Sequence, residues 1–302
     1  MGQDSVPSLI DRAQAAGADA DLLRSVATRA EKAGLGPEQT AEFLRPAVTL
    51  AERDLPTHPL LNKTLEGLAK RVPAGRMTPV LQQLQANTER AGTLVSTWLK
   101  RKDTNQLVGQ SASSSARTQL ITSVTEAQQQ NVPVKTVEQF LDGLPGGVQR
   151  RSMPLSEVAA AVSVMPDLPG SASNPTVTNQ LLTAALDVGY DRKSLQQLPV
   201  ALERAQRETQ RPPAAIAKGT ARAIAKGTPA ARVLQNLFQG AMPGEGPPSG
   251  VGTGPPDTPP GQGKPPGEGN VPPGVDPGER GPGNNPGQGD GNQGSGNRGG
   301  GT

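Results

Sequence analysis

The chain of 302 residues lacks cysteine altogether and has a single histidine. The absence of cysteine excludes disulfides, thiolate catalysis and cysteine metal sites. Long apolar runs are also missing, because none approaches the roughly 18 residues that a membrane-spanning helix needs. The first residues, Met-Gly-Gln-Asp-Ser-Val-Pro, contain neither a basic nor an apolar segment, so we expect no secretory signal within them. The sequence therefore predicts no transmembrane segment. Aromatic residues are scarce as well: Phe43, Trp98, Phe140, Tyr190 and Phe238.

Motifs that carry chemistry are absent too. His58 stands between Thr57 and Pro59 with no cysteine or second histidine to join it, so we interpret it as a residue of a turn. A metal site or a catalytic dyad at His58 would need partners from far along the sequence. No serine lies in Gly-x-Ser-x-Gly, and neither a phosphate-binding Gly-x-x-x-x-Gly-Lys loop nor a dinucleotide-binding Gly-x-Gly-x-x-Gly motif occurs in its proper context. We predict no catalytic, cofactor-binding or metal-binding residues and no enzymatic activity.

Glycine and proline, in contrast, are abundant, and they gather at one end. In residues 243–302, 35 of the 60 positions are Gly or Pro, and the apolar residues are three valines. Such a segment buries too little apolar surface to offset its ordering entropy, so we predict a disordered tail. Its glycines follow no sustained period of three, which excludes a collagen triple helix. The expected role is a flexible C-terminal tether.

The remaining 242 residues predict an all-α protein. Apolar residues recur at spacings of three and four, and no run alternates as a strand would. In residues 21–33 one face is apolar, Asp19 precedes it as a cap, and Gly34 follows it as a stop. The longest helix is predicted to begin at Thr78-Pro79 and to run towards Lys102. Further helices are predicted near 7–16, 37–54, 58–71, 114–130, 134–143, 154–164, 176–188, 191–209, 212–227 and 229–239, with Pro46 and Pro199 starting, kinking or splitting two of them.

The helices are predicted to form an irregular array of hairpins in two related halves. The small polar stretch at 109–115 places the division between residues 1–110 and 111–242. A helix–turn–helix pattern recurs at 25–44, at 123–141 and more loosely at 181–198. A second pattern repeats at an offset of 156, and chance similarity among Ala-rich helices is the alternative explanation. The matches are Pro56 with Pro212, Leu60 with Ile216, Leu68-Ala69-Lys70 with Ile224-Ala225-Lys226, and Pro73, Ala74 and Arg76 with Pro229, Ala230 and Arg232.

The segment from Leu60 to Pro73 reads Leu-x-x-Lys-x-x-Glu-Gly-Leu-Ala-Lys-Arg-Val-Pro. It resembles a segment of uncharacterised exported bacterial helical proteins, many of which end in Gly-rich tails. The resemblance covers about 40 residues well. It implies a signal peptide that this sequence does not contain, and it implies no known activity.

One predicted helix, at 212–227, has its basic residues on one side and its apolar residues on the other. Ile216, Thr220, Ile224, Ala217, Ala223 and Gly227 share one arc, whereas Lys218, Arg222 and Lys226 form a ridge on the other side, which Arg232 extends. Because the tail has six acids and three bases and the whole chain is +3, the body carries about +6. The ridge has two interpretations, and a merely solvated face is the favoured one; the other is weak contact with a polyanion. The solvated face is favoured because three bases would neutralise few phosphates and no aromatic residue interleaves them to stack on nucleotides. In the matching helix, Glu66 is expected to pair with Lys63 and Lys70.

Taken together, these features favour a non-enzymatic helical interaction or structural protein whose protein partner the sequence does not identify. The resemblance implies export to the periplasm or the extracellular space, with the cytoplasm as the alternative. The alternative function is a polyanion-binding accessory protein that contacts nucleic acid or an anionic surface through Lys218, Arg222, Lys226 and Arg232.

Overall fold

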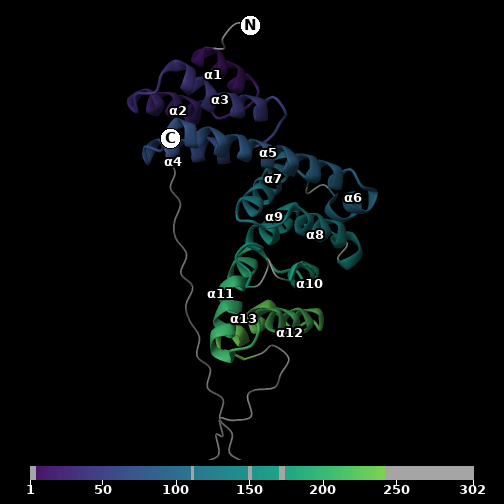
Figure 1. Cartoon of the computed structure of the whole chain (residues 1–302). Helices are drawn as coiled ribbons and strands as arrows, with labels where there is room; N and C mark the ends of the chain where they lie inside the picture. Colours follow the sequence, from purple (N-terminus) through teal and green to yellow (C-terminus); the bar gives the residue numbers. More distant parts are fainter. Residues whose placement is uncertain (1–4, 110–111, 149–151, 170–173, 242–302) are drawn as a thin grey trace, which may run out of the picture. The chain divides into compact units, whose positions relative to one another are not determined.

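The computed structural model describes residues 5–109, 112–148, 152–169 and 174–241, and their regular structure is entirely α-helical (Figure 1). This confirms the all-α prediction. The predicted disordered tail, residues 243–302, lies outside the described residues. The helices are α1 (Val6–Ala15), α2 (Ala20–Lys32), α3 (Pro37–Ala51), α4 (His58–Ala69), α5 (Ala74–Leu99), α6 (Lys102–Val108), α7 (Ser114–Gln129), α8 (Val134–Gly147), α9 (Leu155–Val164), α10 (Pro175–Asp187), α11 (Arg192–Thr209), α12 (Pro213–Ala225) and α13 (Ala230–Phe238).

The longest helix differs from its prediction at both ends. α5 begins at Ala74 rather than at Thr78, because the carbonyl of Pro73 accepts bonds from the N–H groups of Arg76 (2.9 Å) and Met77 (3.2 Å) and so closes the first turn. Pro79 consequently lies inside the helix. Pro46 and Pro199 also lie inside α3 and α11, so neither helix starts or is split at its proline. At the other end the chain leaves α5 after Leu99 and forms α6 as a separate short helix.

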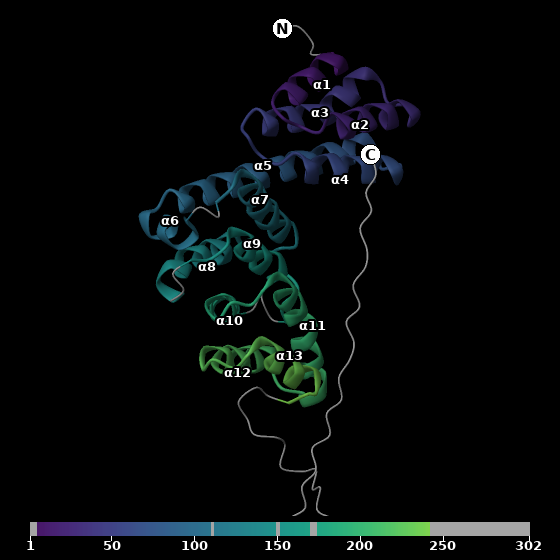
Figure 2. The ribbon, with the colours of Figure 1, turned by 180° about the vertical axis from the view of Figure 1, so that it is seen from behind.

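Each helix packs chiefly on its next-but-one neighbour in the chain. The odd-numbered helices α1 to α13 contact one another in succession, and the even-numbered helices do so from α6 to α12, as well as between α2 and α4 (Figures 1 and 2). Consecutive helices therefore alternate between two rows. This arrangement is typical of stacked helical hairpins.

Two hydrophobic cores lie within this stack, and α5 contributes to both. One core holds buried residues of α1 to α5, the last of them Leu84, and the other begins with Ala91 and continues to Leu237. Leu55 packs against both cores. The core thus changes in the middle of α5, whereas the predicted boundary between residues 110 and 111 falls outside the described residues. The division into two related halves remains a prediction.

Six connections in the described residues share one turn geometry. In each, a residue with positive φ ends the helix, one residue follows it, and the next is the N-cap of the following helix. The N–H of the middle residue donates to the carbonyl five residues earlier, as from Leu35 to Ala30 (3.0 Å) and from Val132 to Ala127 (2.9 Å), which is a Schellman motif. Three of these turns lie in the helix–turn–helix patterns found in the sequence. The residues with positive φ are Gly17, Gly34, Arg71, Asn131, Gly189 and Gly227.

Candidate polyanion-contact surface

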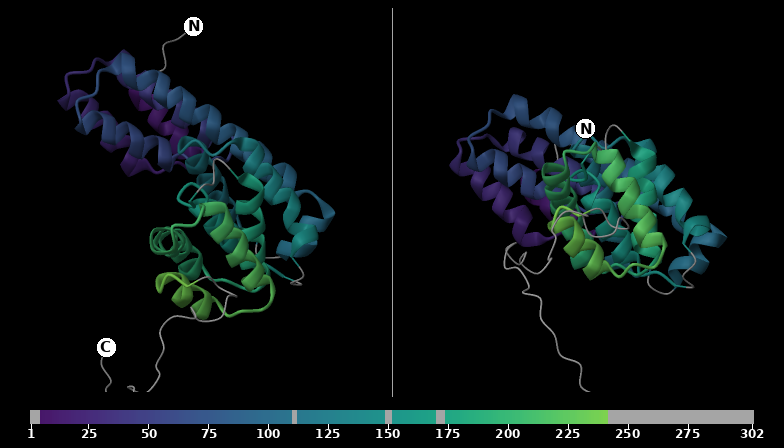
Figure 3. Two further views of the ribbon diagram at one scale, coloured as in Figure 1. Left: turned by 60° about the horizontal axis from the view of Figure 1, so that its bottom comes forward. Right: turned by 90° about the horizontal axis from the view of Figure 1, so that it is seen from below.

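The helix that carries the predicted ridge, α12, packs against α10, α11 and α13 (Figure 3). Ile216 and Ile224 are 1% and 0% exposed, and Thr220 is also fully buried between them. Their burial leaves Lys218, Arg222 and Lys226 exposed on the other side of the helix. This is the arrangement that the helical spacing predicts. We define these three residues as the basic ridge.

Two details of the predicted helix need correction at its end. α12 ends at Ala225, so Lys226 is the C-cap residue rather than part of the last turn. Gly227 was predicted to share the apolar arc, but it is exposed and adopts φ of +81° in the turn to α13. A Cβ there would meet no atom within 4 Å, so backbone conformation and not close packing requires glycine. Arg232 follows this turn, exposed in the first turn of α13.

The charges of the ridge are uncompensated. Among the described residues, none of Lys218, Arg222, Lys226 and Arg232 makes a side-chain hydrogen bond or an ion pair. Arg222 and Lys226 lie near the C-terminal end of α12, where cations interact favourably with the helix dipole. The ridge therefore presents three positive side chains to solvent from a helix that packs on three others.

The matching helix α4 shows the opposite pattern. Glu66 Oε2 lies 2.9 Å from Lys63 Nζ and its Oε1 lies 2.5 Å from Lys70 Nζ, which confirms the predicted pairs. The hydrogen bond from Lys70, followed by that from Lys63, lowers the pKa of Glu66 to about 2. At the offset of 156 residues Glu66 corresponds to Arg222, and Lys70 corresponds to Lys226. In α4 an acid thus lies between two bases and pairs with both, and α12 has a base in its place.

Charge counting along the chain would have strengthened the case for this region. Residues 1–190 contain 18 bases and 18 acids, whereas residues 191–232 contain nine bases and three acids. The entire excess of positive charge in the body therefore lies in α11, α12 and α13 and the residues that flank them. One of these bases, Arg207, pairs with Glu203 at 2.9 Å. Exposed bases that the sequence prediction did not include are Arg192, Lys193 and Arg204.

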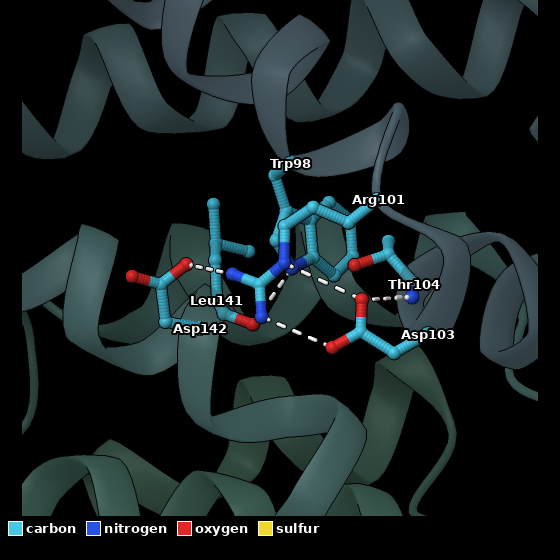
Figure 4. Close-up of polar contacts among 6 residues, drawn as sticks. All are labelled: Trp98, Arg101, Asp103, Thr104, Leu141 and Asp142. Atoms are coloured by element: carbon cyan, nitrogen blue, oxygen red, sulfur yellow. Dashed lines mark hydrogen bonds and ion pairs between the residues drawn. The ribbon is translucent and has the colours of Figure 1, made fainter.

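A second charged cluster has a structural role. Arg101, the N-cap residue of α6, donates through Nη1 to Asp142 of α8 (2.5 Å) and through Nη2 to Asp103 (3.0 Å) (Figure 4). Its hydrogen bond to Asp103 raises the pKa of Arg101 and lowers that of Asp103. Beside it, Trp98 Nε1 donates to the carbonyl of Leu141 (2.7 Å). These contacts fix the junction of α5 and α6 against α8.

Other types of site receive no support from the described residues. His58 begins α4, and its Nδ1 lies 3.0 Å from Nδ2 of Asn62. No group of three or more His, Cys, Asp or Glu residues in the described ranges is placed to hold a metal ion. No helix in those ranges is long and apolar enough to cross a bilayer.

Comparisons of the chain with protein-family models, with curated proteins and with solved structures give no match. The chemistry of the basic ridge therefore rests on its own geometry. Exposed Lys and Arg side chains without interleaved aromatic residues contact phosphate or sulfate groups but do not stack on bases. Where basic side chains of this kind bind a polyanion, the binding has no sequence preference and depends on salt.

Proposed function

We propose that this chain is a non-enzymatic interaction protein whose stacked helices present surfaces to other macromolecules. The observation that carries the proposal is the packing of each helix on its next-but-one neighbour. Stacked helical hairpins bury one side of each helix and leave a long row of exposed faces, which proteins of this architecture use to bind partners.

The perturbed ionisable groups support a non-enzymatic role. Glu66, Arg101 and Asp103 owe their shifted pKa values to surface ion pairs, and Asp191 owes its lowered pKa to the hydrogen bonds of a helix cap. Burial alone raises the pKa values of Tyr190 and Glu126. These groups do not come together as a nucleophile and its base, which is the arrangement that activates a catalytic side chain.

The proposed setting is the periplasm or the extracellular space, with residues 243–302 as a flexible tether. It is supported by the resemblance of Leu60–Pro73 to exported helical proteins and by the Gly/Pro-rich composition of the tail. Fusing the natural upstream region of the reading frame to a periplasmic reporter tests the location. Reporter activity confined to the cytoplasm would refute export.

Photo-crosslinking in the source cells tests the interaction function. Large apolar side chains exposed to solvent are natural attachment points, and a photo-reactive residue replaces each one singly: Val80 (49% exposed), Val134 (37%), Val188 (41%) and Val200 (59%). We expect one protein to be captured repeatedly from some of these positions and not from the others. Capture that is absent from all four positions, or indiscriminate at all four, would contradict a specific interaction surface.

A second candidate function is polyanion binding, and the uncompensated ridge favours it. Positive charge is concentrated in residues 191–232, and Lys218, Arg222 and Lys226 have no partner among the described residues. We expect weak binding to heparin or duplex DNA that disappears near physiological salt. Replacing the three bases together with Gln should abolish it.

A further inference from the structure

A groove lies between the ends of α2 and α4 and the beginning of α5, and all of its charged lining residues are basic. Its volume is about 510 Å³, within the range of about 300–1,000 Å³ that is usual for ligand pockets. Arg29 and Lys32 line it from α2, and Arg71 lines it from the turn after α4. We name it the cationic groove. Its lining residues are Arg29, Lys32, Ala33, Leu35, Leu68, Ala69, Arg71, Val72, Pro73 and Ala74.

The three bases of the cationic groove are uncompensated. Within the described residues their side chains make no hydrogen bond and no ion pair, and no acid lines the groove. Arg29 and Lys32 lie in the last turn of α2, where the helix dipole favours cations, so the helix alone accounts for these two bases. It does not account for Arg71.

Arg71 occupies a backbone position that favours glycine. Its φ is +54°, in the left-handed region that is unfavourable for a residue with a Cβ atom. Of the six turns that share this geometry, four have glycine at the same position, and another has Asn131, a residue type that tolerates it. The dipole of α4 favours a cation near its end, but the C-cap residue Lys70 already places one there. The chain thus retains a strained arginine that bonds to no described residue, which points to a role in binding.

The other lining residues define the chemistry of the anion that fits. All seven are Ala, Leu, Val or Pro, so none of these side chains can hydrogen-bond to a sugar hydroxyl or stack on a base. A phosphate backbone would leave the apolar wall formed by Leu35, Leu68 and Val72 without a contact. The three bases are exposed, so the groove is open to solvent and can receive a segment of a larger molecule. A peptide with carboxylates on both sides of an apolar residue satisfies the bases and the wall together.

We propose that the cationic groove binds an acidic segment of a partner protein, in which carboxylates flank an apolar side chain. Arg29, Lys32 and Arg71 pair with the carboxylates through charge-assisted hydrogen bonds, and the apolar side chain packs on Leu68 and Val72. The inference rests on the proposed interaction function and specifies the chemistry of a partner for it. It concerns a surface separate from the basic ridge of α12.

The test measures peptide binding to the full chain and to an Arg71→Gly variant. The probes are N-acetylated, C-amidated hexapeptides in which two Asp or Glu residues flank one Leu or Val, and the same peptides with Asn or Gln in place of the acids. We expect the wild type to bind acidic peptides but not their amide counterparts, with NMR shifts of the methyl groups of Leu68 and Val72. Arg71→Gly should weaken this binding at least tenfold. Because glycine adopts the left-handed conformation without strain, the variant should also melt about 2–4 °C higher, whereas loss of a structural arginine would lower the melting temperature.

Two further variants make the result specific. Lys32→Gln should also weaken binding of the acidic peptides. Lys102→Gln, at an exposed position of α6 outside the groove, changes the net charge equally and should leave binding intact.

The inference is overturned if no acidic peptide binds the wild type, if the amide peptides bind equally well, or if binding survives in Arg71→Gly. Binding of heparin or DNA without binding of any acidic peptide would also overturn it, because the bases would then serve a polyanion. Each of these failures leaves the broader interaction function to be judged by the crosslinking experiment, since none of its four valines lines the cationic groove.

Discussion

Replacing Arg222 by glutamate separates polyanion binding from stability within one helix. A carboxylate at this position lies four residues from both Lys218 and Lys226, so it can pair with each of them as Glu66 pairs with its two lysines in α4. The substitution removes one cation and engages the other two. The net charge of the chain falls from +3 to +1.

The structure sets the expected magnitudes. If the three bases of the ridge each contact one phosphate of duplex DNA, the slope of log K against log salt is about −2.7, and raising salt from about 50 to 200 mM weakens binding about 40-fold. Arg222→Glu should reduce the slope by at least about one. Each exposed i,i+4 pair contributes about 0.3–0.5 kcal/mol, and an acid near a helix C-terminus costs a similar amount. The melting temperature should therefore change by only a degree or two.

The assay is fluorescence anisotropy of a labelled DNA duplex, and of heparin, at several salt concentrations. Arg76→Glu is the matched control, because Arg76 is an exposed base of α5 and its replacement changes the net charge by the same amount. We expect the control to retain most of the binding and its salt slope. Equal losses in the two variants would mean that net charge alone matters, and they would refute a role for the ridge.

Three other predictions concern the body of the protein. Leu44→Ala, in the core formed by α1 to α5, should lower the free energy of unfolding by about 2–5 kcal/mol. Because Trp98 belongs to the other core, the change in its fluorescence on heating should lag behind the loss of helical circular dichroism. Coincident transitions would show a single cooperative unit. Tyr190→Phe should raise the free energy of unfolding by about 1 kcal/mol in urea denaturation, since the buried hydroxyl has no partner among the described residues; a destabilised variant would indicate a bound water. Glu66→Gln should lower the melting temperature slightly at pH 7. Because the pKa of Glu66 is about 2 in the folded chain against an ordinary 4.5, the difference between variant and wild type should vanish as the pH falls through that interval. A difference that persists below pH 2 would refute the ion-pair explanation.

Local patterns in the sequence predicted the features that depend on one helix. Apolar spacing located most helices and both sides of α12, and the i,i+3 and i,i+4 spacing around Glu66 predicted its two ion pairs. Such features follow from 3.6 residues per turn without knowledge of the rest of the fold. None of these features depends on how the helices pack against one another.

Features that join segments far apart in the chain could not be predicted from the sequence. At the break between α5 and α6, Arg101 donates a hydrogen bond to Asp142, which is 41 residues away in the chain. Asn87 of α5 and Gln128 of α7 likewise line one groove only because α5 and α7 pack together. The i,i+4 relation of Gln83 and Asn87 was visible in the sequence, but a buried, unpaired Gln128 becomes apparent only in the packed structure.

The offset of 156 residues makes a final prediction about how the chain arose. Thr64 of α4 and Thr220 of α12 correspond at this offset, and both are 0% exposed, whereas the exposed pair Glu66 and Arg222 differs in sign. Duplication followed by divergence of the surface would leave this record, because buried positions tolerate fewer changes than solvated ones. Superposing α4 on α12 should then also align α2 with α10 and α3 with α11, whose starts differ by 155 residues in each case. If those helices diverge when α4 and α12 are superposed, the repeat reflects composition alone, and Arg222 has no evolutionary relation to Glu66.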